Sequence, residues 1–247
     1  MNDIFIVAEK EMNSTMKKKK ALGGIIYVMI LMVALPIFIF ISLVNDVEAP
    51  TPEATSQVIS MMLEFFVNNY CFNYTVAMTL FFTWGLAFDA FFGEKMKKTI
   101  ETLLATPLTP RCILFGKTLG IFSIAYPVTI ITTISFILAA NLSAPEGISY
   151  LPDYLIWVHL FTVLPFLCFF IIGTVGAIQL IVRDFKAGNF VIFAIGFLCI
   201  FLPSIAGRDF PPLKDMILIY VALTGVMALL MCLCMRFITK ERIVLST

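Results

Sequence analysis

Between two long apolar segments lies the polar stretch GEKMKKTIETLLATPLTPR, residues 93–111. Its apolar residues recur every three to four positions, which predicts one apolar stripe on a short helix; they are Met96, Ile100, Leu103 and Leu104. Pro107 cannot continue that helix, and Thr109-Pro110 is typical of an N-cap followed by the first residue of a new helix. A helix this short needs a surface on which to dock, either the lipid interface or a partner protein.

The composition around this stretch is that of an integral membrane protein. Of the 247 residues, 60% are hydrophobic and only 13% are charged, and 25 are phenylalanine, far from the balance of a soluble domain. The net charge of +1, without a basic groove interleaved with aromatic residues, gives no indication of a nucleic-acid partner. The six cysteines form no CxxC pair, so we expect small buried hydrophobes rather than disulfides or a metal site.

Six apolar runs predict an all-α fold with six transmembrane helices in one membrane domain, residues 1–247. The runs cover residues 21–44, 70–92, 113–140, 154–182, 188–205 and 216–238, and all but the fifth reach the roughly 20 residues that a helical span needs. The helical pattern of the second run begins earlier, within 50–69, so we expect this helix to extend outside the bilayer.

An amphipathic helix is expected before the first span, over residues 3–20. Its apolar residues share one helix face, which suits a helix lying in the headgroup plane; they are Ile4, Phe5, Ala8, Met12 and Met16.

The distribution of basic residues predicts the orientation. Fifteen of the seventeen lysines and arginines lie in the N-terminal segment, in 93–117, in 183–187 or at the C-terminus. Cytoplasmic segments carry such an excess of Lys and Arg. Both termini and the 93–110 loop are therefore expected on the cytoplasmic side.

Few residues suggest chemistry within the chain. Gly116-Lys117-Thr118 has the ending of a phosphate-binding loop but lacks the earlier glycine and the preceding strand, so no nucleotide site is expected there. His159 has no neighbouring metal ligands in sequence, and we expect a structural or interfacial role rather than catalysis. Asp89 is an intramembrane acid, which is a functional candidate by default, although it could also reach the interface or pair with Lys95 or Lys117.

Two stripes of side chains are candidates for a substrate path. One repeats every four residues on the second span and the other follows one face of the fifth; their members are Thr75, Thr79, Thr83, Phe190, Phe193, Phe197 and Phe201. The alternative is helix packing for the threonines and lipid contact for the phenylalanines.

The pattern of Glu94-Lys95, then KTIETLLATPL at 98–108, then LFGK at 114–117 resembles the first cytoplasmic loop of ABC transporter permeases of the type-2 exporter class. The resemblance extends to the six-span layout and the N-terminal amphipathic helix. It implies that the 93–110 loop is a coupling helix that contacts a cytoplasmic ATP-binding subunit, with coupling residues Glu94, Lys98, Thr99, Glu101, Leu103, Leu104, Thr106 and Pro107.

In this family two permease units, identical or paralogous, face each other across a path lined by the second and fifth spans. The resemblance therefore implies the transmembrane half-subunit of an ATP-driven exporter in the plasma membrane, with ATP and Mg on the partner chain and no catalytic, cofactor or metal residue on this one. The main alternative is a secondary transporter or channel not driven by ATP, which would need charged relay residues or inverted repeats in mid-membrane. An intramembrane enzyme comes third, because the sequence offers no paired acids and no nucleophile with a base.

Overall fold

The computed structural model describes residues 2–17, 19–46, 52–96, 108–145, 147–181 and 213–238. Every regular element in these ranges is a helix: α1 Asn2–Lys17, α2 Lys19–Asn45, α3 Pro52–Ala87, α4 Gly93–Met96, α6 Pro110–Ser143, α7 Tyr154–Val158, α8 Leu164–Ile181 and α10 Leu213–Phe237. Two further helical segments are π-helical turns, η1 Phe88–Phe92 and η2 His159–Val163.

Five helical segments of the described chain are long and apolar enough to cross a membrane: Gly23–Asn45, Glu53–Lys95, Pro110–Ser143, Tyr154–Ile181 and Leu213–Phe237. They match the first, second, third, fourth and sixth predicted spans. The predicted fifth span, residues 188–205, lies outside the described residues. The second segment has 43 residues, or about 65 Å of helix, roughly twice the hydrocarbon thickness, so it extends beyond one crossing as expected.

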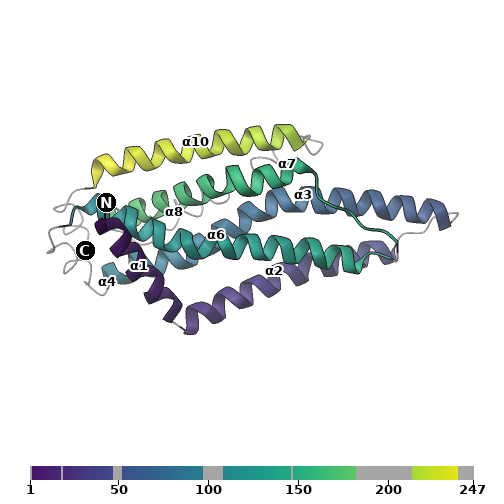
Figure 1. Ribbon diagram of the computed structural model, residues 1–247, viewed down its shortest axis with the longest axis horizontal. Coiled ribbons are helices and arrows are strands. Elements are labelled where there is room, and N and C mark those ends of the chain that lie inside the picture. Colours follow the sequence, from purple (N-terminus) through teal and green to yellow (C-terminus); the bar gives the residue numbers. More distant parts are fainter. Residues whose placement is uncertain are drawn as a thin grey trace.

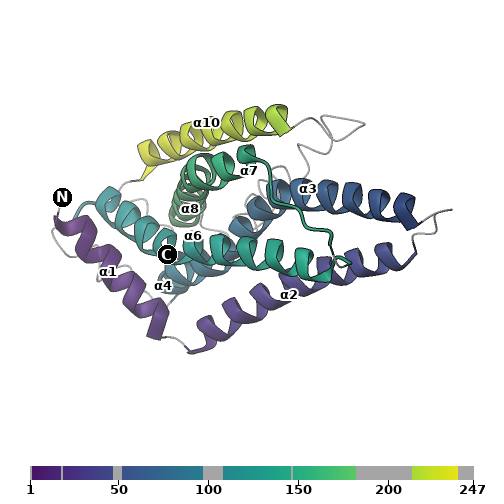
Figure 2. The ribbon, with the colours of Figure 1, turned by 45° about the vertical axis from the view of Figure 1, so that its right-hand side comes forward.

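Helix α6 lies at the centre of the bundle. It contacts α1, α2, α3 and α8, while α10 packs against α8 (Figures 1 and 2). Figure 1 shows α1 running obliquely across one end of the bundle, the end that also holds α4 and the last turn of α10. The segments with most of the described lysines and arginines therefore meet at one end.

The start of α6 was predicted correctly. Thr109 is its N-cap, and the Thr109 hydroxyl accepts a hydrogen bond from the Cys112 backbone N–H at 3.3 Å. Pro110 occupies the first helical position, where its missing N–H costs no hydrogen bond.

At the opposite end of the bundle, hydrogen bonds join Asn141 of α6 to Tyr150 of the following loop. The Tyr150 backbone N–H donates to Asn141 Oδ1 at 2.7 Å, and Asn141 Nδ2 donates to the Tyr150 carbonyl at 3.1 Å. Asn68 Nδ2 of α3 donates to the Tyr150 hydroxyl at 2.7 Å. Burial raises the pKa of Tyr150, so the ring stays neutral and ties the loop after α6 to α3.

The residues expected to form one apolar face of α1 fall into two groups, one packed against the protein and one exposed. Ala8 is buried and Ile4 half-buried toward the protein, whereas Phe5, Met12 and Met16 are exposed on the adjoining face. Packing against α6 separates the two groups, since α6 covers only part of the helix circumference.

Five of the six cysteines lie in the described residues, and for these the expectation of burial was wrong in part; Cys199 lies outside the described residues. Cys71 and Cys168 are buried, Cys112 and Cys234 are half-buried, and Cys232 is exposed. Cys232 lies on α10, which contacts the bundle mainly through α8, so much of its surface faces outward.

Candidate functional site

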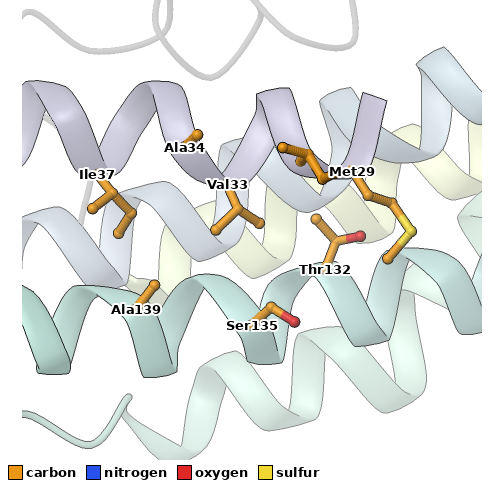
Figure 3. A pocket seen from close by; sticks show the side chains of 8 residues that line it. Met29, Val33, Ala34, Ile37, Thr132, Ser135 and Ala139 are labelled. Atoms are coloured by element: carbon orange, nitrogen blue, oxygen red, sulfur yellow. The ribbon is translucent and has the colours of Figure 1, made fainter. Parts of the chain in front are cut away.

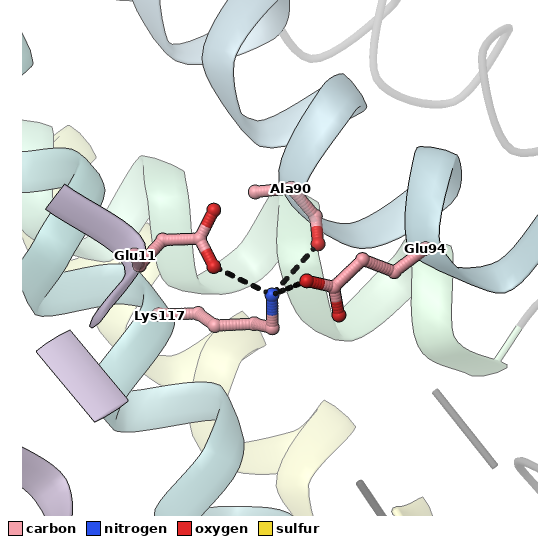
Figure 4. Close-up of polar contacts among 4 residues, drawn as sticks. All are labelled: Glu11, Ala90, Glu94 and Lys117. Carbon is pink, nitrogen blue, oxygen red and sulfur yellow. Dashed lines mark hydrogen bonds and ion pairs between the residues drawn. The ribbon is translucent and has the colours of Figure 1, made fainter. Parts of the chain in front are cut away.

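A buried ion cluster at the α1 end of the bundle is the strongest candidate for a functional site. It is centred on Lys117 of α6, which is only 1% exposed. Lys117 Nζ lies 2.7 Å from Glu11 Oε2 of α1 and 2.9 Å from Glu94 Oε1 of α4. It also donates to the Ala90 carbonyl of η1 at 2.9 Å (Figure 4). One ammonium group therefore joins four elements of the chain.

Two glycines explain how α1 comes so close to α6. A Cβ at Gly116 would lie 2.6 Å from Val7 Cβ and 2.9 Å from the Ile4 carbonyl oxygen. A Cβ at Gly120 would lie 2.8 Å from the Ala8 carbonyl oxygen. Glycines four residues apart leave one face of a helix without side chains and allow a second helix to approach closely. This approach places Glu11 over Lys117.

The other side of the cluster is formed by η1 and α4, which are in turn packed against α8. Lys117 Nζ lies 5.7 Å from the centre of the Phe91 ring. That ring occupies the space at Gly176 of α8, where a Cβ would come within 2.6 Å of it. Lys95 is also buried and donates to the Gln179 carbonyl at 3.3 Å. The segment leading out of the second span is thus held between α6 and α8.

The electrostatics of the cluster favour a structural joint over a reactive centre. Burying a charge is costly unless the charge is paired and hydrogen-bonded, and Lys117 meets this requirement with two carboxylates and one carbonyl. The Glu11 side chain is 9% exposed and that of Glu94 is 27% exposed. Glu94 is therefore the more hydrated of the two acids, and Glu11 depends more strongly on the lysine.

Among the predicted coupling residues, Glu94 belongs to this cluster. The other seven, Lys98 to Pro107, lie outside the described residues. Because Glu94 sits in α4, immediately before them in sequence, the cluster holds the beginning of the predicted coupling stretch.

In the sequence, Lys117 was noted as a possible partner of Asp89, as the end of the LFGK segment of the family resemblance and as part of Gly116-Lys117-Thr118. All three of those residues lie inside α6, so they form helix rather than a phosphate-binding loop. The backbone of Asp89 belongs to η1, and its side chain lies outside the description. Glu11 and Lys117 are 106 residues apart, and the spacing of Gly116 and Gly120 was the one local signal of the close helix contact.

Of the predicted path residues, Thr75 and Thr79 are described and both are buried. Their hydroxyls donate to carbonyls of their own helix, Thr75 to Cys71 at 2.7 Å and Thr79 to Thr75 at 2.8 Å. The Thr83 side chain and the stripe of Phe190, Phe193, Phe197 and Phe201 lie outside the described residues. A path along these positions stays a prediction.

His159 lies beside Thr75 and is completely buried. Its Nε2 is 3.4 Å from the Thr75 hydroxyl oxygen, and its ring is tilted against those of Phe72 and Tyr220, at 4.8 Å and 5.1 Å between ring centres. In the described part of the chain, no group of His, Cys, Asp or Glu side chains has the arrangement of a metal site. These contacts hold the ring in the interior of the bundle, and the structural or interfacial role of His159 stays a prediction.

An apolar groove lies between α2 and α6, with a volume of about 410 Å³. Figure 3 shows the facing side chains of the two helices; the lining residues are Met29, Ile30, Val33, Ala34, Ile37, Thr132, Ser135 and Ala139. The Thr132 hydroxyl donates to the Val128 carbonyl at 2.8 Å. The groove carries no charged group, unlike the Lys117 cluster.

The family of the chain follows from comparison with known proteins. The sequence matches the family model described as ABC-2 family transporter protein over residues 5–183. The chain belongs to this family. It is thus a multi-pass membrane subunit of an ABC transporter, an ABC-2 type permease, as the resemblance of the 93–117 region implied. The matched region includes Glu11, Glu94 and Lys117, the three charged residues of the cluster. A search of curated proteins found no match to the chain.

Proposed function

We propose that this permease is the transmembrane half-subunit of an ATP-driven exporter. A second permease, identical or paralogous, completes the path for the cargo, and a separate cytoplasmic subunit binds ATP and Mg and hydrolyses the nucleotide. The protein lies in the plasma membrane with both termini in the cytoplasm. The path residues are those of the threonine and phenylalanine stripes.

The observation that carries this proposal is the position of the Lys117 cluster. The cluster ties α4, which opens the predicted coupling stretch, to α6 at 2.9 Å and through the same lysine to α1 at 2.7 Å. A displacement of the coupling stretch by a partner would therefore act directly on the central helix of the bundle. The meeting of α1, α4 and the last turn of α10 at one end supports a common cytoplasmic side.

The test targets the proposed contact with the ATP-binding subunit. Leu104→Ala and Glu101→Ala should insert into the membrane normally, yet weaken association with that subunit or separate ATP hydrolysis from transport. Truncating a well-packed anchor of a helix in a groove costs about 2 kcal/mol or more, roughly thirty-fold in affinity. The measurements are co-purification of the ATP-binding subunit and transport into inverted vesicles.

Lys97→Ala, away from the apolar stripe of the stretch, is the matched control and should bind like the wild type. If Leu104→Ala and Glu101→Ala both retain wild-type association and transport, the 93–110 loop is an interfacial anchor and the exporter proposal loses its main support.

The orientation has a separate test. Single cysteines at Glu53, Glu146 and Asp209 should react with an impermeant reagent added outside the cell, whereas cysteines at Lys98, Lys186 and Lys240 should not. External labelling at Lys98 would overturn both the orientation and the coupling role.

A further inference from the structure

The second span ends in a π-helical turn, η1, directly before the predicted coupling stretch. A π-helical turn inside an α-helix contains one additional residue and disturbs the regular i→i−4 ladder, so that a carbonyl near the turn loses its donor within the helix. The Ala90 carbonyl of η1 accepts a hydrogen bond from Lys117 Nζ at 2.9 Å. The same ammonium pairs with Glu94, four residues further on.

We infer that Lys117 is a positioning residue that holds η1 in the π-helical register and thereby sets the rotational position of the coupling stretch. Lys117 contacts both sides of the turn's C-terminal half, the Ala90 carbonyl within η1 and the Glu94 carboxylate just after it. The inference rests on the proposed function for its consequence, since the coupling role of the stretch is what makes its orientation matter.

No proline lies within η1 or directly after it. The turn has the sequence FDAFF, residues 88–92, and Gly93 follows it. The other π-helical turn of the described chain, η2, is followed by Pro165, which has no N–H to donate to a carbonyl one turn earlier. We therefore attribute the register of η1 to tertiary contacts, and among the described residues Lys117 provides a charged one through the Ala90 carbonyl.

Release of Lys117 would have a defined geometric result. If η1 returned to α-helical register, every residue after it would rotate by about 100° and advance by about 1.5 Å relative to α3. Glu94 would leave Lys117, and Lys95 would leave the Gln179 carbonyl. The inference therefore gives α4, directly before the coupling stretch, two discrete orientations, and switching elements of this kind convert small local changes into larger ones.

The experiment measures the orientation directly. Spin labels are introduced through an unnatural amino acid at Ser123, an exposed residue of α6, and at Lys97, which leaves the native cysteines unlabelled. Pulsed electron paramagnetic resonance on the full-length protein in lipid nanodiscs then gives the distance distribution between the two labels. This readout needs neither cargo nor the ATP-binding subunit.

The test variant is Glu11→Gln with Lys117→Met, which removes the lysine without stranding the most buried acid. Its matched control is Glu11→Gln alone, which keeps Lys117 on Ala90 and Glu94. The control should show the wild-type distance, and the double variant should shift by several ångströms, as a rotation of about 100° on a helix requires. An unchanged distance in the double variant would overturn the inference.

Deletion of Ala90 distinguishes a change of helical register from a general loss of structure. The deletion removes the additional residue of the turn, so the residues after it keep their rotational position while the π-helical turn disappears. In the Glu11→Gln, Lys117→Met background it should restore the wild-type distance, and in the otherwise wild-type chain it should leave that distance unchanged. A shifted distance in either case contradicts the inference, even where the lysine-free variant does not fold.

The outcomes also separate this inference from the proposed function. If the distance shifts and is restored as expected while co-purification of the ATP-binding subunit is the same in all variants, the register mechanism holds and the coupling role of the stretch fails.

Discussion

The two π-helical turns in the described part of this permease are built in the same way but maintained differently. In each, a carbonyl accepts a hydrogen bond from a side chain of α6: Ala90 of η1 from Lys117 at 2.9 Å, and Leu160 of η2 from the Tyr126 hydroxyl at 3.2 Å. Behind η2 lies Pro165, whose missing N–H makes the interruption a local property of the sequence. No proline follows η1 within one helical turn. The contact that we infer to maintain η1 is the buried ion cluster of Lys117.

This difference separates a fixed interruption from a conditional one. No movement of the surrounding helices can supply the N–H that Pro165 lacks, so the interruption at η2 is part of the sequence. An ion pair can be broken by moving one partner, and two of the partners of Lys117 belong to α1 and α4, at the end of the bundle where the ATP-binding subunit is proposed to bind. The helix irregularity near the coupling stretch is thus the one that other parts of the protein can control.

The largest expected effect is that of Lys117→Met on the wild-type background. The substitution leaves Glu11 and Glu94 without their common counter-ion, and breaking a buried ion pair by removing one partner costs about 3–5 kcal/mol. The free energy of unfolding should fall by that amount in denaturant titrations of the detergent-purified protein. A loss below about 1 kcal/mol, the value typical of exposed pairs, would show that the cluster is solvated and that η1 does not depend on it.

The next effect is expected from Gly176→Ala, which acts on η1 from the side of α8. The new Cβ would lie 2.6 Å from the Phe91 ring, and overpacking of this kind costs about 1–3 kcal/mol. Gly173→Ala on the same helix is the control, because its new Cβ meets the flexible end of Met231, which can move aside. Thermal unfolding should rank Gly176→Ala below Gly173→Ala in stability; the reverse order would mean that η1 is not held against α8.

A smaller loss in the free energy of unfolding is expected from Tyr126→Phe, the matching change at η2. It removes the donor to the Leu160 carbonyl and keeps the ring, so the cost should be about 1 kcal/mol, the net value of a neutral hydrogen bond. The same unfolding measurement should therefore separate Lys117→Met clearly from Tyr126→Phe. Equal losses would remove the distinction between the two turns.

The smallest effect is an interaction between two substitutions at η2. Pro165→Ala supplies the N–H that the proline lacks, so a carbonyl of η2 gains a donor within its own helix. On that background Tyr126→Phe should cost less than it does alone, and a double-mutant cycle should give a coupling of about 0.5 kcal/mol or more. Strict additivity would show that Pro165 is not the reason why the Leu160 carbonyl is available to Tyr126.

Much of the fold follows from local properties of the chain. Apolar runs about 20 residues long predicted five of the helices that the structure describes, because a span must satisfy its own backbone hydrogen bonds and be apolar along its whole length. Thr109 and Pro110 predicted the start of α6 within a residue, since capping depends on neighbouring side chains only. The KTIETLLATPL segment at 98–108 pointed to the ABC-2 family, to which the chain belongs.

The candidate site was only partly accessible from the sequence. The resemblance singled out Glu94 as a coupling residue and included Lys117 at the end of the LFGK segment. Glu11 lies in the expected N-terminal amphipathic helix, where it had no assigned role. An ion pair between residues 106 positions apart leaves no periodic signal in the chain. The π-helical turns were not foreseen, because a single additional residue in a helix does not alter hydropathy measured over a span.

The sequence by itself therefore determined where the helices lie and that they belong to a membrane, since both depend on the polarity and spacing of consecutive residues. The tertiary structure alone decided which helices meet, that Gly116 and Gly120 admit α1 onto α6, and that Lys117 joins α1, η1 and α4. Those contacts depend on how separate helices approach in space. The role of a lysine in an apolar helix can be assigned only when the structure shows which carboxylates surround it.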